Sequence, residues 1–98
     1  MELEFKKENG KFVAEFKVSA EFNIHIEKQL TGDLILKQRS IENGQYDVIE
    51  DFGYNKGGDF VIDRDVQGFI APKWIKIESA VLPTLAVITT SGDVEQVN

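Results

Sequence analysis

The chain has 98 residues, a formal net charge of −6 from 17 acidic and 11 basic side chains, and no cysteine. This length suits one domain that buries a core without disulfides. The lack of cysteine excludes disulfides, thiolate metal sites and cysteine nucleophiles. The acidic balance, with no basic run longer than Lys6-Lys7, argues against binding to nucleic acid or an anionic membrane surface.

The N-terminal residues, Met1–Phe5, do not form the basic and then apolar pattern of a signal peptide. No apolar stretch approaches the roughly 20 residues that a helix needs to cross a bilayer. We therefore expect synthesis in the cytoplasm and no membrane partner. No motif in the sequence indicates a cofactor.

A β-hairpin is predicted at the start of the chain, because apolar and polar residues alternate over 2–8 and 11–18 around Asn9-Gly10. Asn-Gly is the strongest short hairpin signal, since both residues tolerate the positive φ of a type I′ turn. A two-residue loop pairs residues whose numbers sum to the same value. The predicted pairs are Phe5 with Ala14, Leu3 with Phe16, Glu2 with Lys17 and Glu8 with Lys11.

Further strands follow in chain order. Residues 21–28 alternate, with Phe22, Ile24 and Ile26 on one face, and the more uniformly apolar 34–39 indicates a central strand. After a turn at 42–44, residues 45–49 run back. The Gly-rich segment 50–59 is expected to be a loop, and Asp63-Arg64-Asp65 a turn. The other expected strands are 60–62, 69–71, 73–79 and 85–90, and the polar tail 91–98 is expected to fray.

About eight short strands at intervals of about 8–12 residues are typical of a sandwich or small barrel. The sequence therefore predicts an all-β chain: an antiparallel β-sandwich, jelly-roll or immunoglobulin-like, over residues 1–90. Its core is expected to consist of Leu3, Phe5, Phe12, Phe16, Phe22, Ile24, Ile26, Leu34, Leu36, Ile75 and Ile77.

Two groups of residues are candidates for a ligand site. Asp59, Asp63 and Asp65 cluster near the Gly-rich loop and could supply oxygens to a calcium ion. Their spacing does not match a calcium-binding loop, and 17 acids also produce such clusters by chance. Trp74 and Tyr54 could form a stacking platform for a glycan if they are exposed. The alternative is that Trp74 is covered by a loop or by the other sheet.

His25 is the only histidine, on the polar side of its strand. Catalysis would need a nucleophile or second base beside it, and a metal site more ligands. An ordinary exposed or cross-strand histidine is the simpler interpretation, and no group of residues argues for an enzyme.

Three segments, 22–27, 41–46 and 71–77, resemble small β-sandwich proteins of tailed-phage and prophage virions. The resemblance implies a role in a head, neck or tail assembly, with symmetric self-association, and assigns no functional residue. Jelly-roll carbohydrate-binding modules have a similar pattern. Our first hypothesis is therefore a non-enzymatic structural or interaction protein, located in the virion if of phage origin, with protein partners that include copies of itself. The alternative is a carbohydrate-binding module.

The apolar segment 81–88, interrupted by Pro83, has two interpretations. It could be a contact patch between subunits, as a repeating assembly requires. It could equally be the strand that completes the second sheet of a monomer.

Overall fold

The computed structural model describes residues 1–28, 32–52, 60–67 and 72–98. This described part contains nine strands and no helix. It therefore has no candidate for a membrane-spanning helix. The strands are β1 (Lys6–Glu8), β2 (Lys11–Val18), β3 (Phe22–Lys28), β4 (Leu34–Arg39), β5 (Asp47–Asp51), β6 (Phe60–Val66), β7 (Lys73–Ser79), β8 (Leu85–Thr90) and β9 (Val94–Gln96).

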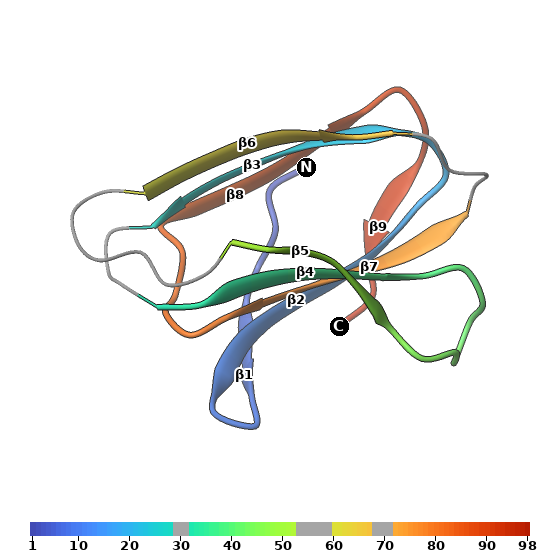
Figure 1. Cartoon of the computed structure of the whole chain (residues 1–98). Helices are drawn as coiled ribbons and strands as arrows, with labels where there is room; N and C mark the ends of the chain where they lie inside the picture. The colour runs from blue at the N-terminus through green and yellow to red at the C-terminus, as the bar shows by residue number, and fades with distance from the viewer. Residues whose placement is uncertain (29–31, 53–59, 68–71) are drawn as a thin grey trace.

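The strands form two antiparallel sheets, packed face to face as a β-sandwich (Figure 1). The larger sheet has the order β1-β2-β7-β4-β5, and β9 pairs with β2 beside β1. The smaller sheet has the order β6-β3-β8. β4 lies between β7 and β5, which confirms the interior position predicted from its apolar sequence. The all-β class is thus confirmed.

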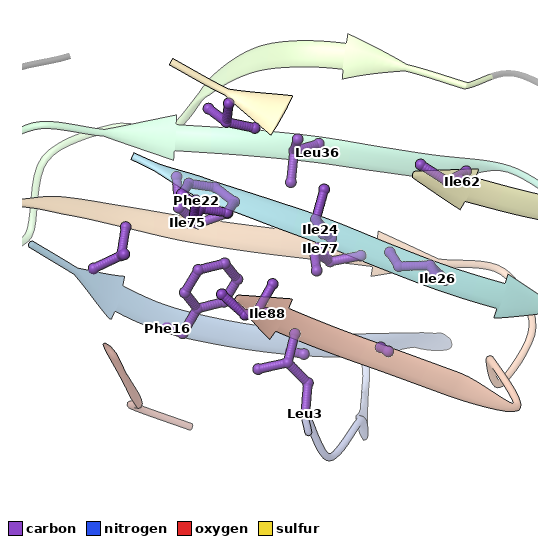
Figure 2. Packing of buried hydrophobic residues seen from close by; sticks show 14 of the residues in the cluster. Leu3, Phe16, Phe22, Ile24, Ile26, Leu36, Ile62, Ile75, Ile77 and Ile88 are labelled. Atoms are coloured by element: carbon purple, nitrogen blue, oxygen red, sulfur yellow. The ribbon is translucent and has the colours of Figure 1, made fainter. Parts of the chain in front are cut away.

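The core lies between the sheets, where alternate residues of both point inward (Figure 2). Phe16 of the larger sheet meets Phe22 of the smaller one edge to face, with ring centroids 5.5 Å apart. Each fully buried side chain of this kind contributes about 1.5–3 kcal/mol. Nine of the eleven predicted core residues are buried, but Phe5 and Phe12 are only partly so.

The first hairpin turns as predicted, since Asn9 and Gly10 have φ of 51° and 79° and Glu8 pairs with Lys11. Beyond Lys6 the predicted register is wrong. Residues 1–3 leave β2, cross to the smaller sheet and pair with β8, where Leu3 N donates to Ala86 O at 2.8 Å. Because the chain crosses to the smaller sheet here, the Leu3 side chain is buried in the core and the backbone of residues 1–3 covers the edge of β8. Phe5, Leu3 and Glu2 therefore do not pair with β2.

The polar tail does not fray as expected, because it forms β9 on the stretch of β2 that the N-terminal residues leave open. Gln96 and Asn98 supply side-chain amides where backbone pairing stops. Asn98 Oδ1 accepts from Glu15 N at 2.9 Å, and Asn98 Nδ2 donates to Val13 O at 3.0 Å. Satisfied backbone groups therefore hold this segment, together with Val94, which packs against the hydrophobic core.

Residues 63–65 do not form the expected turn; they lie within β6, which pairs in continuous register with β3. The cross-strand partners explain the difference. Asp63 lies opposite His25, and Asp65 lies opposite Asn23. Charged and polar side chains that face each other on the solvent side of a sheet stabilise strand pairing, so these residues extend the strand instead of ending it. The turn at 42–44 is confirmed, with Asn43 at φ 64° and Gly44 N donating to Ile41 O. The expected strand 69–71 lies outside the described residues.

Candidate interaction surfaces

Each sheet turns one face to solvent. In the larger sheet, strands β2, β7 and β4 align three rows of three outward residues, and strands β6, β3 and β8 do the same in the smaller sheet. Directly opposed residues share a face, so the register defines both surfaces. The aromatic face of the larger sheet consists of Val13, Glu15, Lys17, Trp74, Lys76, Glu78, Ile35, Lys37 and Arg39. The acidic face of the smaller sheet consists of Val61, Asp63, Asp65, Asn23, His25, Glu27, Leu85, Val87 and Thr89.

Trp74 lies at the end of the aromatic face, between its cross-strand neighbours Lys17 and Arg39. The Lys17 ammonium is 5.2 Å from the indole ring and the Arg39 guanidinium carbon 5.9 Å. These long side chains leave Trp74 only 9% exposed. The prediction of an exposed stacking surface therefore fails for Trp74, because long cationic side chains cover an aromatic ring on a sheet face.

Tyr46, just before β5, lies over the same face. Its ring is 4.6 Å from the Arg39 guanidinium carbon and 4.9 Å from Lys76 Nζ. Its hydroxyl donates to Glu15, which also pairs with Arg39 at 3.7 Å. Burial, assisted by Glu15, raises the pKa of the phenol, and the charge of Arg39 only partly offsets this. Arg39 is thus held between the rings of Tyr46 and Trp74.

The central row of the aromatic face places Lys37 and Lys76 side by side, and Lys37 pairs with Glu78. Burial alone would raise the pKa of Glu78, but the hydrogen bond from Lys37 and the nearby lysine charges lower it overall. Of the four cations on this face, Lys37 and Arg39 contact carboxylates and Lys17 and Lys76 lie over rings. Four cations against Glu15 and Glu78 give the face a formal charge of +2.

The acidic face has His25 at its centre, held between two carboxylates. Nδ1 lies 3.0 Å from Asp63 Oδ2, and Nε2 lies 3.1 Å from Glu27 Oε2. The hydrogen bond to Asp63, followed by that to Glu27, raises the pKa of His25. Three carboxylates, with no lysine or arginine, give the nine positions a formal charge of −3 with His25 neutral.

Asp63 and Asp65 are brought together as neighbours along β6, joined by one amide. Asn23 Nδ2 donates to Asp63 Oδ1 at 2.8 Å and to Asp65 Oδ1 at 2.9 Å. The bond from Asn23, and then His25, lowers the pKa of Asp63. Within the described part of the chain, no three His, Cys, Asp or Glu residues are arranged to hold a metal ion. The remaining predicted ligand, Asp59, lies outside the described residues, as does Tyr54.

Sequence reasoning did not select Arg39 and Tyr46 as site residues. The signal was available for Arg39, because outward alternation puts it in the same row as Trp74 if the two strands pair in that register. Tyr46 could not be placed from alternation, because it precedes the strand and reaches the face through the turn. Arg39 Nη1 fixes that turn by donating to Gly44 O at 3.2 Å.

The apolar segment 81–88 contains both buried core residues and residues that point to solvent. Ala86 and Ile88 are buried in the core, so this part completes the smaller sheet. Leu85 and Val87 point outward on the acidic face and are half-buried, and Leu82 in the preceding turn is 56% exposed. The strand is therefore core on one side and available surface on the other.

A hollow of about 580 Å³ opens at one end of the aromatic face, lined by Lys17, Ser19, Pro72, Asp93, Val94 and Glu95. Its polar groups maintain the fold: Ser19 Oγ accepts from Asp93 N at 2.7 Å, and Ser19 N donates to Asp93 O at 2.9 Å. These bonds join the β2–β3 turn to the β8–β9 turn.

No family model, curated protein or solved structure matches the chain. The resemblance to phage virion proteins therefore stays a prediction.

Proposed function

We propose that the chain is a non-enzymatic structural protein that assembles with copies of itself, the aromatic face of one copy contacting the acidic face of the next. The opposite charge of these faces, +2 and −3 over nine positions each, is the observation that supports it. Both faces have the spacing of a three-stranded antiparallel sheet, so rows of one can lie over rows of the other.

Each face has charges that remain available to a neighbouring copy. On the aromatic face, Lys17 and Lys76 contact rings, and their ammonium groups can also donate hydrogen bonds to a carboxylate of another copy. On the acidic face, the Asp63 side chain is 60% exposed and that of Glu27 44%. Carboxylate oxygens accept several hydrogen bonds each, so their bonds to His25 and Asn23 leave capacity for a lysine.

Such a contact is heterologous, because it joins the aromatic face of one copy to the acidic face of another. Each dimer keeps one free face of each kind, so association continues beyond a dimer. Nine side chains a face is below the 20–30 residues of a standard interface, and exposed ion pairs contribute about 0–1 kcal/mol each. We therefore expect dissociation constants on the order of 0.1–1 mM per contact. Repeated subunits, as in a phage head, neck or tail, strengthen weak contacts through multivalency.

Sedimentation velocity over about 10 µM to 1 mM tests the proposal. The weight-average sedimentation coefficient should rise with concentration in about 20 mM salt and stay that of a monomer in about 300 mM, where charges are screened within several ångströms. Asp63→Lys combined with Asp65→Lys should abolish the rise. The matched control, Asp33→Lys with Glu42→Lys, makes the same charge change at exposed positions outside the nine-residue faces and should keep it.

A chain that stays monomeric at every concentration in low salt would contradict the proposal. The Asp63/Asp65 variant could instead still associate, or high salt could strengthen association. Either result would point to an apolar contact through exposed residues such as Leu82.

A further inference from the structure

The two edges of the smaller sheet differ in how they are covered. The edge of β8 is occupied by residues 1–3: the Met1 ammonium donates to Ile88 O, and Ile88 N donates to Met1 O, each at 2.8 Å. The edge of β6 has no such partner among the described residues, whose strand pairing places β6 beside β3 alone. Unpaired N–H and C=O groups along an edge form a template for another strand.

Proteins usually guard such an edge with charged side chains, above all lysines, or with proline or a β-bulge. β6 contains no lysine and no proline, and its seven residues pair with β3 without a register shift. Its one cation, Arg64, lies on the opposite side of the strand from Asp63 and Asp65, with Nη2 2.9 Å from Glu50 Oε2 of the other sheet. The outward charges on the edge are therefore both carboxylates.

These carboxylates disfavour a second copy at the edge. Antiparallel pairing of β6 with itself about Arg64 would oppose Asp63 to Asp65 twice, and pairing about Asp63 would oppose Asp63 to itself. Like charges directly opposite one another on a sheet are destabilising. The edge is therefore selective against its own sequence.

We propose that the edge of β6 binds an extended, cationic segment of a partner protein as an added antiparallel strand. Main-chain hydrogen bonds to β6 supply affinity, and alternate side chains supply specificity. The added strand would place two basic residues, separated by one residue, opposite Asp65 and Asp63. An apolar residue would follow beside Val61, which is 56% exposed. The pattern that fits is basic-x-basic-x-apolar.

This inference does not depend on self-assembly, because the strand binds at the edge and not over the face. It is tested with isotope-labelled chain at about 50 µM, below the range in which stacking is expected. The probe is the blocked peptide Thr-Lys-Thr-Lys-Thr-Val-Thr. Amide chemical shifts should move along β6, with dissociation constants of about 0.1–1 mM.

Two control peptides separate the contributions. Replacing both lysines with glutamate should remove binding, and methylating the backbone nitrogens that face β6 should weaken it at least tenfold while leaving the charge unchanged. Among protein variants, Asp63→Asn with Asp65→Asn should weaken binding roughly tenfold, as expected for two exposed charge contacts. The matched pair Asp93→Asn with Glu95→Asn, at exposed positions on and beside β9, should not.

Equal binding of the methylated peptide would overturn the proposal, because charge alone would then explain the affinity. Shifts that fall on β2 or β9 instead of β6, or an Asp63/Asp65 variant that is folded by its spectrum and binds as well as the original chain, would also overturn it.

Discussion

The two outer faces have the same backbone arrangement, and their charges are used differently. On the aromatic face the ion-paired side chains are 17–27% exposed, because they pack against each other and against the rings of Trp74 and Tyr46. On the acidic face the corresponding side chains, His25, Glu27 and Asp63, are 31–60% exposed. The first face covers the sheet and stabilises it, whereas the second presents its charge to solvent.

The difference lies in how much charge each face leaves exposed to solvent. On the outer side of the larger sheet, lysine and arginine side chains lie over aromatic rings and bury apolar surface there. Short carboxylates around one histidine bury little, so their charge remains available. Substitutions of the packed rings Trp74 and Tyr46 on the aromatic face should therefore change the stability of the fold. Substitutions on the acidic face should change association and leave stability nearly unchanged.

Loss of the Trp74 ring at the end of the aromatic face should destabilise the fold most. Trp74→Ala should lower the free energy of unfolding by about 3–5 kcal/mol, because a side chain only 9% exposed leaves a cavity behind. His25→Ala, at the centre of the other face, should cost far less, because its side chain is partly exposed and lies outside the hydrophobic core. Urea unfolding followed by far-UV circular dichroism measures both, since Trp74 is the only tryptophan and its fluorescence is lost.

A similar cost for the two substitutions would remove the distinction between the faces. If Trp74→Ala does not fold, Trp74→Phe provides the comparison, because it keeps a ring between Lys17 and Arg39 and should lie between the original chain and the alanine variant in stability.

A smaller effect is expected at the hydroxyl of Tyr46. Tyr46→Phe removes the hydrogen bond to Glu15 but keeps the ring beside Arg39 and Lys76, so it should cost about 1 kcal/mol. Asn23→Ala, which removes the amide between Asp63 and Asp65, should cost less than half of that, because those carboxylates can bond to water instead. The reverse order in urea unfolding would mean that the acidic face is the more tightly held.

The smallest expected effect is the pH dependence of the acidic face. The pKa of His25 is raised above its ordinary 6.5, so its protonated form adds stability that is present below that pH and lost as pH rises through the raised pKa. The pKa of Asp63 is lowered from 3.8, so its contribution is present above 3.8 and lost as pH falls through the lowered pKa. The pair therefore contributes most between pH 3.8 and 6.5.

His25→Asn should flatten the part of the stability curve above pH 6, where the original chain loses the contribution of the imidazolium. Thermal unfolding at closely spaced pH values measures this slope. If the variant keeps the same slope of stability against pH, Asp63 and Glu27 do not raise the pKa of His25.

The sequence predicted most of the sandwich because a period of two marks which side chains enter the core. Ile24, Ile26, Ile75 and Ile77 follow directly from alternation, and Asn9-Gly10 from turn chemistry. Alternation could not predict that residues 1–3 cross to β8, because a strand that changes sheets keeps the same period. Nor could it predict β9, whose bonds come from the side chains of Gln96 and Asn98 as well as from the backbone.

The candidate site was predicted less well, because it depends on which strands are neighbours. Trp74 was placed on its correct face, but its exposure is decided by Lys17 and Arg39 on two other strands. Asp63 and Asp65 were recognised as a pair, whereas their setting in a continuous strand opposite Asn23 and His25 follows from the β3–β6 register. That register is a long-range property that local patterns do not contain.

Mixing two variants tests whether the aromatic and acidic faces recognise each other by charge. Asp63→Lys with Asp65→Lys makes both faces cationic, and Lys17→Glu with Lys76→Glu makes both acidic. Each variant alone should sediment as a monomer in about 20 mM salt, and an equimolar mixture should associate until about 300 mM salt disperses it. A mixture that sediments as the sum of two monomers, or either variant associating alone as the original chain does, would contradict the account.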